Sequence, residues 1–292
     1  MSELVERSGL RGSVVRERLV SPAGPLSRVE VVPQVGSTNT DLSAALVAEP
    51  GAWGGLSLLA ADQQDQGRGR SGRDWQVPPR AALILSISLW PEPAMLTSLG
   101  WLPLLAGLGA VRAVRATTGV QASLKWPNDL LVDADDANVL EGWGAQRKVG
   151  GILSELVTTP AGPAVVVGIG VNVSQTPDEL PVPSAISLAI AGAPGVDREE
   201  LLVAVVGAFA ELHERWRAAG GDAVAAGLAA EVAAVCATIG LRVRVTLPGG
   251  VELLGLARRI GPDGALVVAD DAGVEHTVLA GDVLHVRATN SP

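Results

Sequence analysis

Cysteine and histidine are scarce in this chain of 292 residues. The single cysteine, Cys236, excludes a disulfide scaffold and any metal site built from several thiolates. The three histidines, at positions 213, 276 and 285, lie far apart and show no spacing typical of metal ligands. We therefore expect no metal site made by protein ligands alone, and we expect the reducing cytoplasm as the location.

Lysine is also nearly absent, since only Lys125 and Lys148 stand among 22 basic residues, and tyrosine is missing altogether. So strong a bias toward arginine tends to replace any lysine that merely keeps a surface hydrated. The two that remain are candidates for sites that need a compact ammonium rather than a planar guanidinium. The alternative is that these two lysines are present by chance, and the residues next to them in the sequence are needed to choose between the two explanations.

An excess of positive charge is missing as well. The formal net charge of −9 and the pI near 4.9 argue against a protein that mainly binds duplex DNA, because phosphate neutralisation needs a basic face. Hydrophobic residues make up 48% of the chain, which favours a folded core over disorder. No secretory signal is visible at the N-terminus. The uncharged run 93–111 contains prolines and glycines, so it predicts a buried helix and no membrane span.

Hydrophobic runs alternate with helical stretches over most of the chain, which predicts an α/β domain with a mixed sheet. The expected strands are 29–32, 56–60, 81–89, 130–132, 150–157 and 164–171, and the expected helices are 40–48, 95–117 and 199–219. From residue 239, five short strands alternate with turns rich in Gly, Pro and Asp: 241–247, 252–260, 265–270, 275–279 and 283–286. The pattern predicts a short N-terminal segment (1–28), a large α/β domain (29–238) that would carry the catalytic site, and a small SH3-like β-barrel (239–292).

A loop of interleaved glycine and arginine stands between two predicted strands: Gln64-Asp65-Gln66-Gly67-Arg68-Gly69-Arg70-Ser71-Gly72-Arg73-Asp74-Trp75. Its glycines allow backbone N–H groups to approach an anion, and its guanidinium groups add charged hydrogen bonds. We expect a negative ligand to order the loop, and the tryptophan to cover an aromatic base. No Gly-Lys-Ser/Thr follows, so this is not a P-loop. An arginine linker that binds RNA loosely is the alternative.

Three further segments combine polar or charged residues with restricted backbone. Lys125-Trp126-Pro127-Asn128-Asp129 groups three functional side chains around a rigid Trp-Pro step, although Pro-Asn-Asp is also ordinary turn chemistry. Lys148-Val149-Gly150-Gly151 places the other lysine at the start of a predicted buried strand. Ser37-Thr38-Asn39 lies where a strand leads into a helix; a helix cap needs one such residue, so the others leave room for a hydrogen-bonding ligand.

These segments, in this order, resemble the biotin protein ligases (biotin–[acetyl-CoA-carboxylase] ligases) over residues 29–288. The resemblance rests on the Gly/Arg loop with Trp75, the Lys-Trp-Pro-Asn-Asp segment, Lys148-x-Gly150-Gly151-Ile152, Ser37-Thr38-Asn39, Gly168-Ile169-Gly170-x-Asn172 and Gly281-Asp282-Val283. It implies a class II synthetase-like catalytic domain of the biotin/lipoate ligase type followed by an SH3-like barrel. It also implies the reaction: biotin and ATP form biotinyl-5′-AMP, and the biotinyl group then passes to a lysine of a biotin carboxyl carrier protein.

The resemblance also assigns roles to residues of this sequence. Charge neutralisation is expected from Arg68, Arg70 and Lys148 together with Mg²⁺. The expected catalytic residues are Lys148, Arg68 and Asp129, and Asp129 is expected to position the incoming lysine or the metal. Biotin contacts are expected from Ser37, Thr38, Asn39, Gln64, Arg68, Gly69, Arg70 and Lys148. Contacts with ATP or the adenylate are expected from Arg70, Arg73, Trp75, Lys125, Asn128, Asn172 and Arg287.

The sequence departs from the family pattern in three places. Ser71 stands where another basic residue is common, which predicts a looser hold on the adenylate. The acidic stretch 133–147 is longer than usual and is interpreted as a surface insertion. The N-terminus resembles that of ligases without a DNA-binding repressor domain, so neither transcriptional control nor DNA binding is expected. A membrane is not an expected partner either. Monomer and homodimer both stay open, as does lipoate–protein ligase activity on a related fold.

Overall fold

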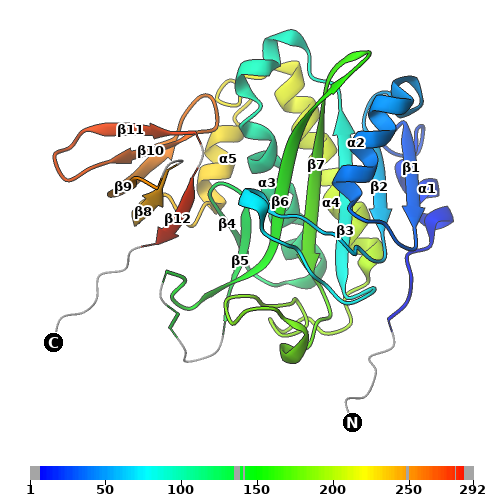
Figure 1. Cartoon of the computed structure of the whole chain (residues 1–292), viewed down its shortest axis with the longest axis horizontal. Helices are drawn as coiled ribbons and strands as arrows, with labels where there is room; N and C mark the ends of the chain where they lie inside the picture. The colour runs from blue at the N-terminus through cyan, green and yellow to red at the C-terminus, as the bar shows by residue number, and fades with distance from the viewer. Residues whose placement is uncertain (1–6, 135–138, 141, 248–249, 280, 286–292) are drawn as a thin grey trace.

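The computed structural model describes residues 7–134, 139–140, 142–247, 250–279 and 281–285. Its larger part is a seven-stranded sheet with the order β1-β2-β3-β7-β6-β5-β4 (Figure 1). The first two strands pair in parallel and all other neighbours pair antiparallel, so the predicted mixed sheet is confirmed. Its strands are β1 (Arg28–Val32), β2 (Ser57–Ala61), β3 (Ala82–Leu89), β4 (Ala122–Lys125), β5 (Asp129–Asp133), β6 (Gln146–Thr159) and β7 (Gly162–Asn172).

The two faces of this sheet carry different helices. α3 (Trp101–Thr118) and α4 (Arg198–Ala218) cover one face, whereas α2 (Thr38–Ala48) lies on the other (Figure 1). Side chains alternate along a strand, so Val165 and Val167 of β7 join the core beneath α3 and α4. Ala164 and Val166 belong to the smaller cluster beneath α2. Every second residue of β7 therefore faces the α2 side of the sheet.

The C-terminal part is a five-stranded antiparallel sheet with the order β11-β10-β9-β8-β12. Its strands are β8 (Arg242–Thr246), β9 (Glu252–Ile260), β10 (Leu266–Ala269), β11 (Glu275–Val278) and β12 (Asp282–His285). Two buried indoles of the larger part bind the β9–β10 turn: Trp101 donates to Pro262 O (2.8 Å) and Trp126 to Gly264 O (3.0 Å). This small sheet is thus fixed beside β4 and α3.

The predicted elements are found, all except the strand 252–260 with shifted ends, and one helix is corrected. The helix expected over 95–117 begins only at Trp101, and a separate 3-10 turn precedes it at Pro93–Ser98. Pro103 can stand in the first turn of α3 because the N–H groups there have no partner inside the helix. No described helix is long and apolar enough to cross a membrane.

Among the described strands and α-helices, one strand and two helices were not predicted. The short strand β4 and the helix α5 (Leu228–Val235) have no distinctive sequence pattern, and α1 (Gly12–Leu19) lies in the segment that was expected only to have helical spacing. Val15 and Leu19 of α1 are buried and pack against β1 and α4.

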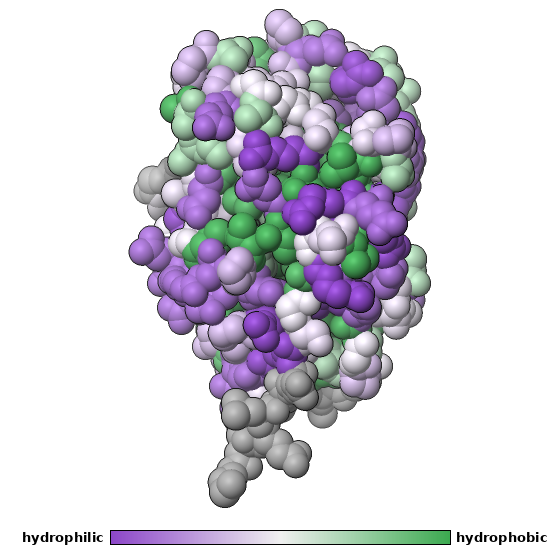
Figure 2. Space-filling model, turned by 90° about the vertical axis from the view of Figure 1, so that its right-hand side faces the viewer, coloured by the Kyte–Doolittle hydropathy of each residue, from purple (hydrophilic) through white to green (hydrophobic). Residues whose placement is uncertain are grey.

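The face seen from the side of β1 and α2 mixes hydrophilic side chains with hydrophobic ones near its middle (Figure 2).

Candidate active site

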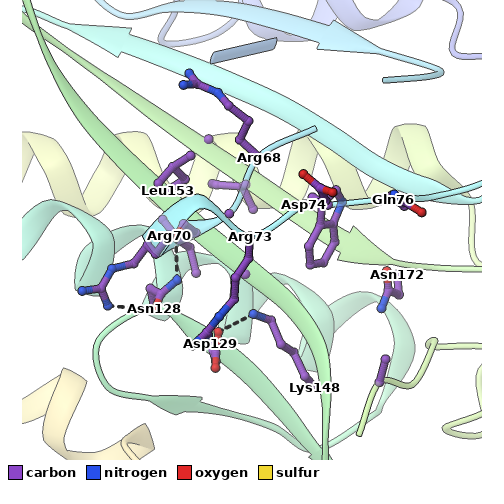
Figure 3. Close-up of a pocket in the computed structure, with 18 of the residues that line it drawn as sticks. Arg68, Arg70, Arg73, Asp74, Gln76, Asn128, Asp129, Lys148, Leu153 and Asn172 are labelled. Atoms are coloured by element: carbon purple, nitrogen blue, oxygen red, sulfur yellow. Dashed lines mark hydrogen bonds and ion pairs between the residues drawn. The ribbon is translucent and has the colours of Figure 1, made fainter. Parts of the chain in front are cut away.

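A cavity of about 510 Å³ opens on the α2 side of the large sheet, within the size range of small-molecule sites. Its walls come from the segments that the sequence singled out, together with 181–185 and β12. Figure 3 shows how several of the lining residues lie. The lining includes Ser37, Thr38, Asn39, Gln64, Arg68, Gly69, Arg70, Arg73, Trp75, Lys125, Asn128, Asp129, Lys148 and Asn172. Of the predicted site residues, Arg287 alone is left out, because it lies outside the described residues.

One end of the cavity is neutral and rich in hydrogen bonds. The Gln64 side-chain oxygen accepts from the backbone N–H of Thr38 (2.7 Å) and from its hydroxyl (3.0 Å). The Ser86 hydroxyl, on β3, lies 2.8 Å from Thr38 Oγ1 and 2.6 Å from Asn39 Oδ1, and it donates its one proton to one of these two oxygens at a time. Ser37 occupies the N-cap position of α2 but makes no side-chain capping hydrogen bond. Ser37 lines the cavity.

Two glycines of β7 make room for this end and for the loop above it. Gly168 pairs with Ser86 across the sheet, and a Cβ at Gly168 would collide with Asn39 Oδ1. At Gly170, a Cβ would lie 2.9 Å from the Trp75 ring. Glycine is required at both positions because other side chains occupy the volume where a Cβ would lie.

Glu155 is a site residue that the sequence reasoning missed. It lies on β6, and one of its carboxylate oxygens accepts from the Asn39 amide (2.7 Å). The Arg68 guanidinium pairs with the same carboxylate at 3.2 Å, and it extends away from Lys148 in Figure 3. In this structure, therefore, Arg68 links the loop to the polar end of the cavity through Glu155.

The Gly/Arg loop is folded over the cavity and anchored to Asn128. Within the loop, Gly69 N–H donates to Arg73 O (2.6 Å) and Trp75 N–H donates to Gly67 O (2.8 Å). Arg70 donates to Asn128 Oδ1 (3.2 Å), and the amide nitrogen of Asn128 donates to the backbone of β6 at Ile152 (2.9 Å). Asn128 thus joins the loop to the sheet.

Lys148 reaches the cavity through an irregularity in β6. Strict alternation would place Lys148 on the face of Gly150, away from the cavity. The β5–β6 register shifts, however, so that Leu130 pairs with Gly150 but Leu131 pairs with Lys148. Such a bulge re-aims a side chain. The Lys148 ammonium consequently meets Asp129 Oδ1 at 2.5 Å and lies 5.8 Å from the centre of the Trp75 ring. Lys148 therefore lies inside β6, and the expectation that it starts the strand is corrected.

Trp75 and Asn172 close the side of the cavity above β7. The Trp75 indole N–H is buried and has no hydrogen-bond partner in the described part of the chain. Asn172 donates to Ile186 O (3.0 Å) and accepts from Gln175 (2.9 Å). Both polar atoms of the Asn172 amide thus hold the segment 172–188, which carries several lining residues.

Lys125 is buried at the other end of the cavity, 4% exposed. It pairs with Asp129 across β4 and β5, so both residues share the face of the sheet that forms the cavity floor. Its ammonium lies 4.1 Å from the centre of the Trp143 ring. Both lysines of the chain therefore line this cavity.

Within the described ranges, no group of three or more His, Cys, Asp or Glu side chains could hold a metal ion.

Comparison with known proteins agrees with this geometry. Residues 31–172 match the biotin/lipoate A/B protein ligase family, and residues 238–286 match the biotin protein ligase C-terminal domain. The chain is 37% identical to the biotin–[acetyl-CoA-carboxylase] ligase of Mycobacterium tuberculosis over 276 residues, 94% of each protein. The chain belongs to the biotin protein ligase family. The enzyme of the same name from Paracoccus denitrificans is 34% identical over 81% of this chain and 92% of that protein.

A solved structure of another biotin protein ligase has the same fold. The ligase from Aquifex aeolicus in complex with biotin and ATP superimposes with a TM-score of 0.69 at 25% identity. The match covers 90% of this chain and all of that one. The expected α/β ligase domain with a small C-terminal β-domain is confirmed for this member of the family.

Proposed function

We propose that this chain activates biotin with ATP, forming biotinyl-5′-AMP, and transfers the biotinyl group to a lysine of a biotin carboxyl carrier domain. One observation carries the proposal: a single cavity joins a neutral hydrogen-bonding end to a cationic end beneath the Gly/Arg loop. Biotin has the same division, with an uncharged ureido ring and a carboxylate. The names of the relatives add the same substrate and a carboxylase as the acceptor.

The neutral end suits the ureido ring. This group offers two N–H donors and one carbonyl acceptor, and it needs partners that carry no net charge. Ser37, Thr38, Asn39 and Gln64 supply hydroxyl and amide groups, and hydrogen bonds to Ser86 and Glu155 fix two of them. Held orientations lower the entropy lost on binding.

We assign Lys148 to the first chemical step. A biotin carboxylate oxygen attacks the α-phosphorus of ATP, the bond to the β-phosphate oxygen breaks, and pyrophosphate leaves. Both reactants are anions, so their approach requires positive charge at the point of contact. Lys148 supplies an ammonium there, and its ion pair with Asp129 keeps it in place. Arg70 of the loop is held at Asn128, which precedes Asp129 in the sequence.

The second step uses the acceptor lysine. Its neutral amine attacks the acyl carbon, the bond to the phosphate oxygen breaks, AMP leaves and the nitrogen loses one proton to solvent. Asp129 is the carboxylate beside Lys148, and we assign it the orientation of the incoming amine. The Gly/Arg loop shields the mixed anhydride from water between the two steps.

We expect magnesium to enter this site as part of MgATP. Asp74 and Asp129 are carboxylates that line the cavity, and Mg²⁺ is usually bound by one or two carboxylates together with substrate phosphates. When bound, the ion would offset phosphate charge. Cytoplasmic location and the absence of DNA and membrane partners remain predictions, and monomer and homodimer both stay open.

The test is direct formation of the adenylate. The protein is incubated with Mg²⁺, ATP and either biotin or lipoate, and the products are analysed by mass spectrometry. We expect biotinyl-AMP and pyrophosphate, and biotin transfer to a carrier domain that contains its acceptor lysine but not to a Lys→Arg carrier. Lipoyl-AMP without biotinyl-AMP would overturn the proposal and make the chain a lipoate ligase.

A further inference from the structure

Trp143 lies on a short turn that the backbone holds closed. Leu140 and Gly144 exchange two backbone hydrogen bonds, of 3.0 and 2.7 Å, and Trp143 N–H also donates to Leu140 O (3.0 Å). Gly142 and Gly144 adopt φ values of +74° and +61°, which residues other than glycine rarely adopt. The buried Arg147 donates to Gly144 O (2.9 Å). The turn is thus a built feature of the stretch that the sequence reasoning interpreted as a surface insertion.

The turn places an indole at the cationic end of the cavity. Trp143 lines the cavity, and the Lys125 ammonium stands 4.1 Å from the centre of its ring. On the other side, a Cβ at Gly142 would lie 3.0 Å from Leu284 of β12, another lining residue. The sheet order separates β4, which carries Lys125, from β3, which carries Ser86, by three strands. Trp143 is therefore remote from the hydrogen-bonding end.

We propose that Trp143 is a positioning residue that holds the Lys125 ammonium toward the polyphosphate of ATP. The inference rests on the proposed function and deepens it. An aromatic face attracts an ammonium through its quadrupole and carries no formal charge, so the contact fixes the position of the cation without neutralising it. A compact ammonium suits a phosphate chain as a point charge. The insertion would thus supply part of the nucleotide site.

The test compares ATP and biotin in the Trp143→Ala variant. We expect the KM for ATP to rise about tenfold, while the KM for biotin and kcat stay within about twofold of the wild type. Trp143→Phe retains an aromatic face and should restore most of the ATP affinity. Val139→Ala is the matched control, because Val139 belongs to the same stretch, is 73% exposed and does not line the cavity. Its kinetics should equal those of the wild type.

Two further measurements test whether Trp143 acts through Lys125. In a Lys125→Ala background, Trp143→Ala should add almost nothing to the KM for ATP, because both changes remove one interaction. By calorimetry, Trp143→Ala should weaken binding of a non-hydrolysable ATP analogue and leave AMP binding nearly unchanged. Additive effects of the two substitutions, or equal losses for AMP and the ATP analogue, would overturn the inference.

The outcomes also separate this inference from the proposed function. Wild-type protein that makes biotinyl-AMP but shows no effect of Trp143→Ala on ATP would refute the inference alone. If the wild-type protein makes no biotinyl-AMP, but the Trp143→Ala variant binds the ATP analogue more weakly than the wild type does, the proposed function is refuted and the role of Trp143 is supported.

Discussion

Replacing Lys148 by arginine tests whether the position of the charge matters as much as its presence. The Lys148 ammonium lies 2.5 Å from Asp129 Oδ1, and both side chains are mostly shielded, 27% and 18% exposed. The lysine side chain passes close to Gly151, where a Cβ would be 3.3 Å from both Cε and Nζ. A longer, planar guanidinium cannot follow this path without displacing its neighbours. Lys148→Arg therefore keeps the charge but moves it.

The expected magnitude follows from the role of the charge. Removing one well-placed donor to a developing anion typically lowers kcat about 10²- to 10³-fold, or roughly 3–4 kcal/mol. We expect Lys148→Met to lose about 10³-fold in adenylate formation and Lys148→Arg about 10²-fold. Binding of each substrate alone should change much less, because the two negative charges meet at Lys148 only during the reaction.

The assay is rapid-quench measurement of biotinyl-AMP in a single turnover with saturating biotin and ATP. Arg18→Ala serves as the control for loss of a positive charge, since Arg18 forms an exposed ion pair with Glu200 on the surface. Such pairs contribute about 1 kcal/mol or less to stability, and this one should not affect the rate. A rate for Lys148→Arg within about threefold of the wild type would refute the assigned role.

Three other changes have definite expected results. Burial lowers the pKa of His213 to about 4 from its ordinary value near 6.5. As the pH falls, the unfolded chain therefore binds a proton at His213 before the folded chain does, and the folded state loses stability. Urea titrations should show a free energy of unfolding about 2 kcal/mol lower at pH 5 than at pH 7. His213→Phe should largely abolish this loss. Gly168→Ala should displace Asn39 and raise the KM for biotin at least about tenfold, whereas Gly207→Ala, where nothing lies near the added methyl, should not change it. Biotin with ATP should protect residues 67–75 from trypsin; unchanged cleavage there would contradict loop closure.

The sequence alone determined the order of the elements and most of the candidate site. Strands and helices follow hydrophobic periodicity, which depends only on neighbouring residues, so 252–260 was predicted with the bounds that β9 has. The Gly/Arg loop and the Lys125–Asp129 segment were identified because glycine, proline and charged residues restrict local backbone and chemistry. The scarcity of lysine added a signal that no local pattern contains, and both lysines do line the cavity.

Only the tertiary structure decided which of these side chains meet. Glu155 and Ser86 lie on different strands, and their contact with Asn39 depends on the β3–β7–β6 register, which no short segment specifies. The same holds for Lys148. Alternation along β6 alone would direct it away from the cavity, and pairing with β5 introduces the bulge that brings it to Asp129. Local sequence fixes periodicity, but register and bulges arise from pairing between distant strands, and they determine the face on which each side chain lies.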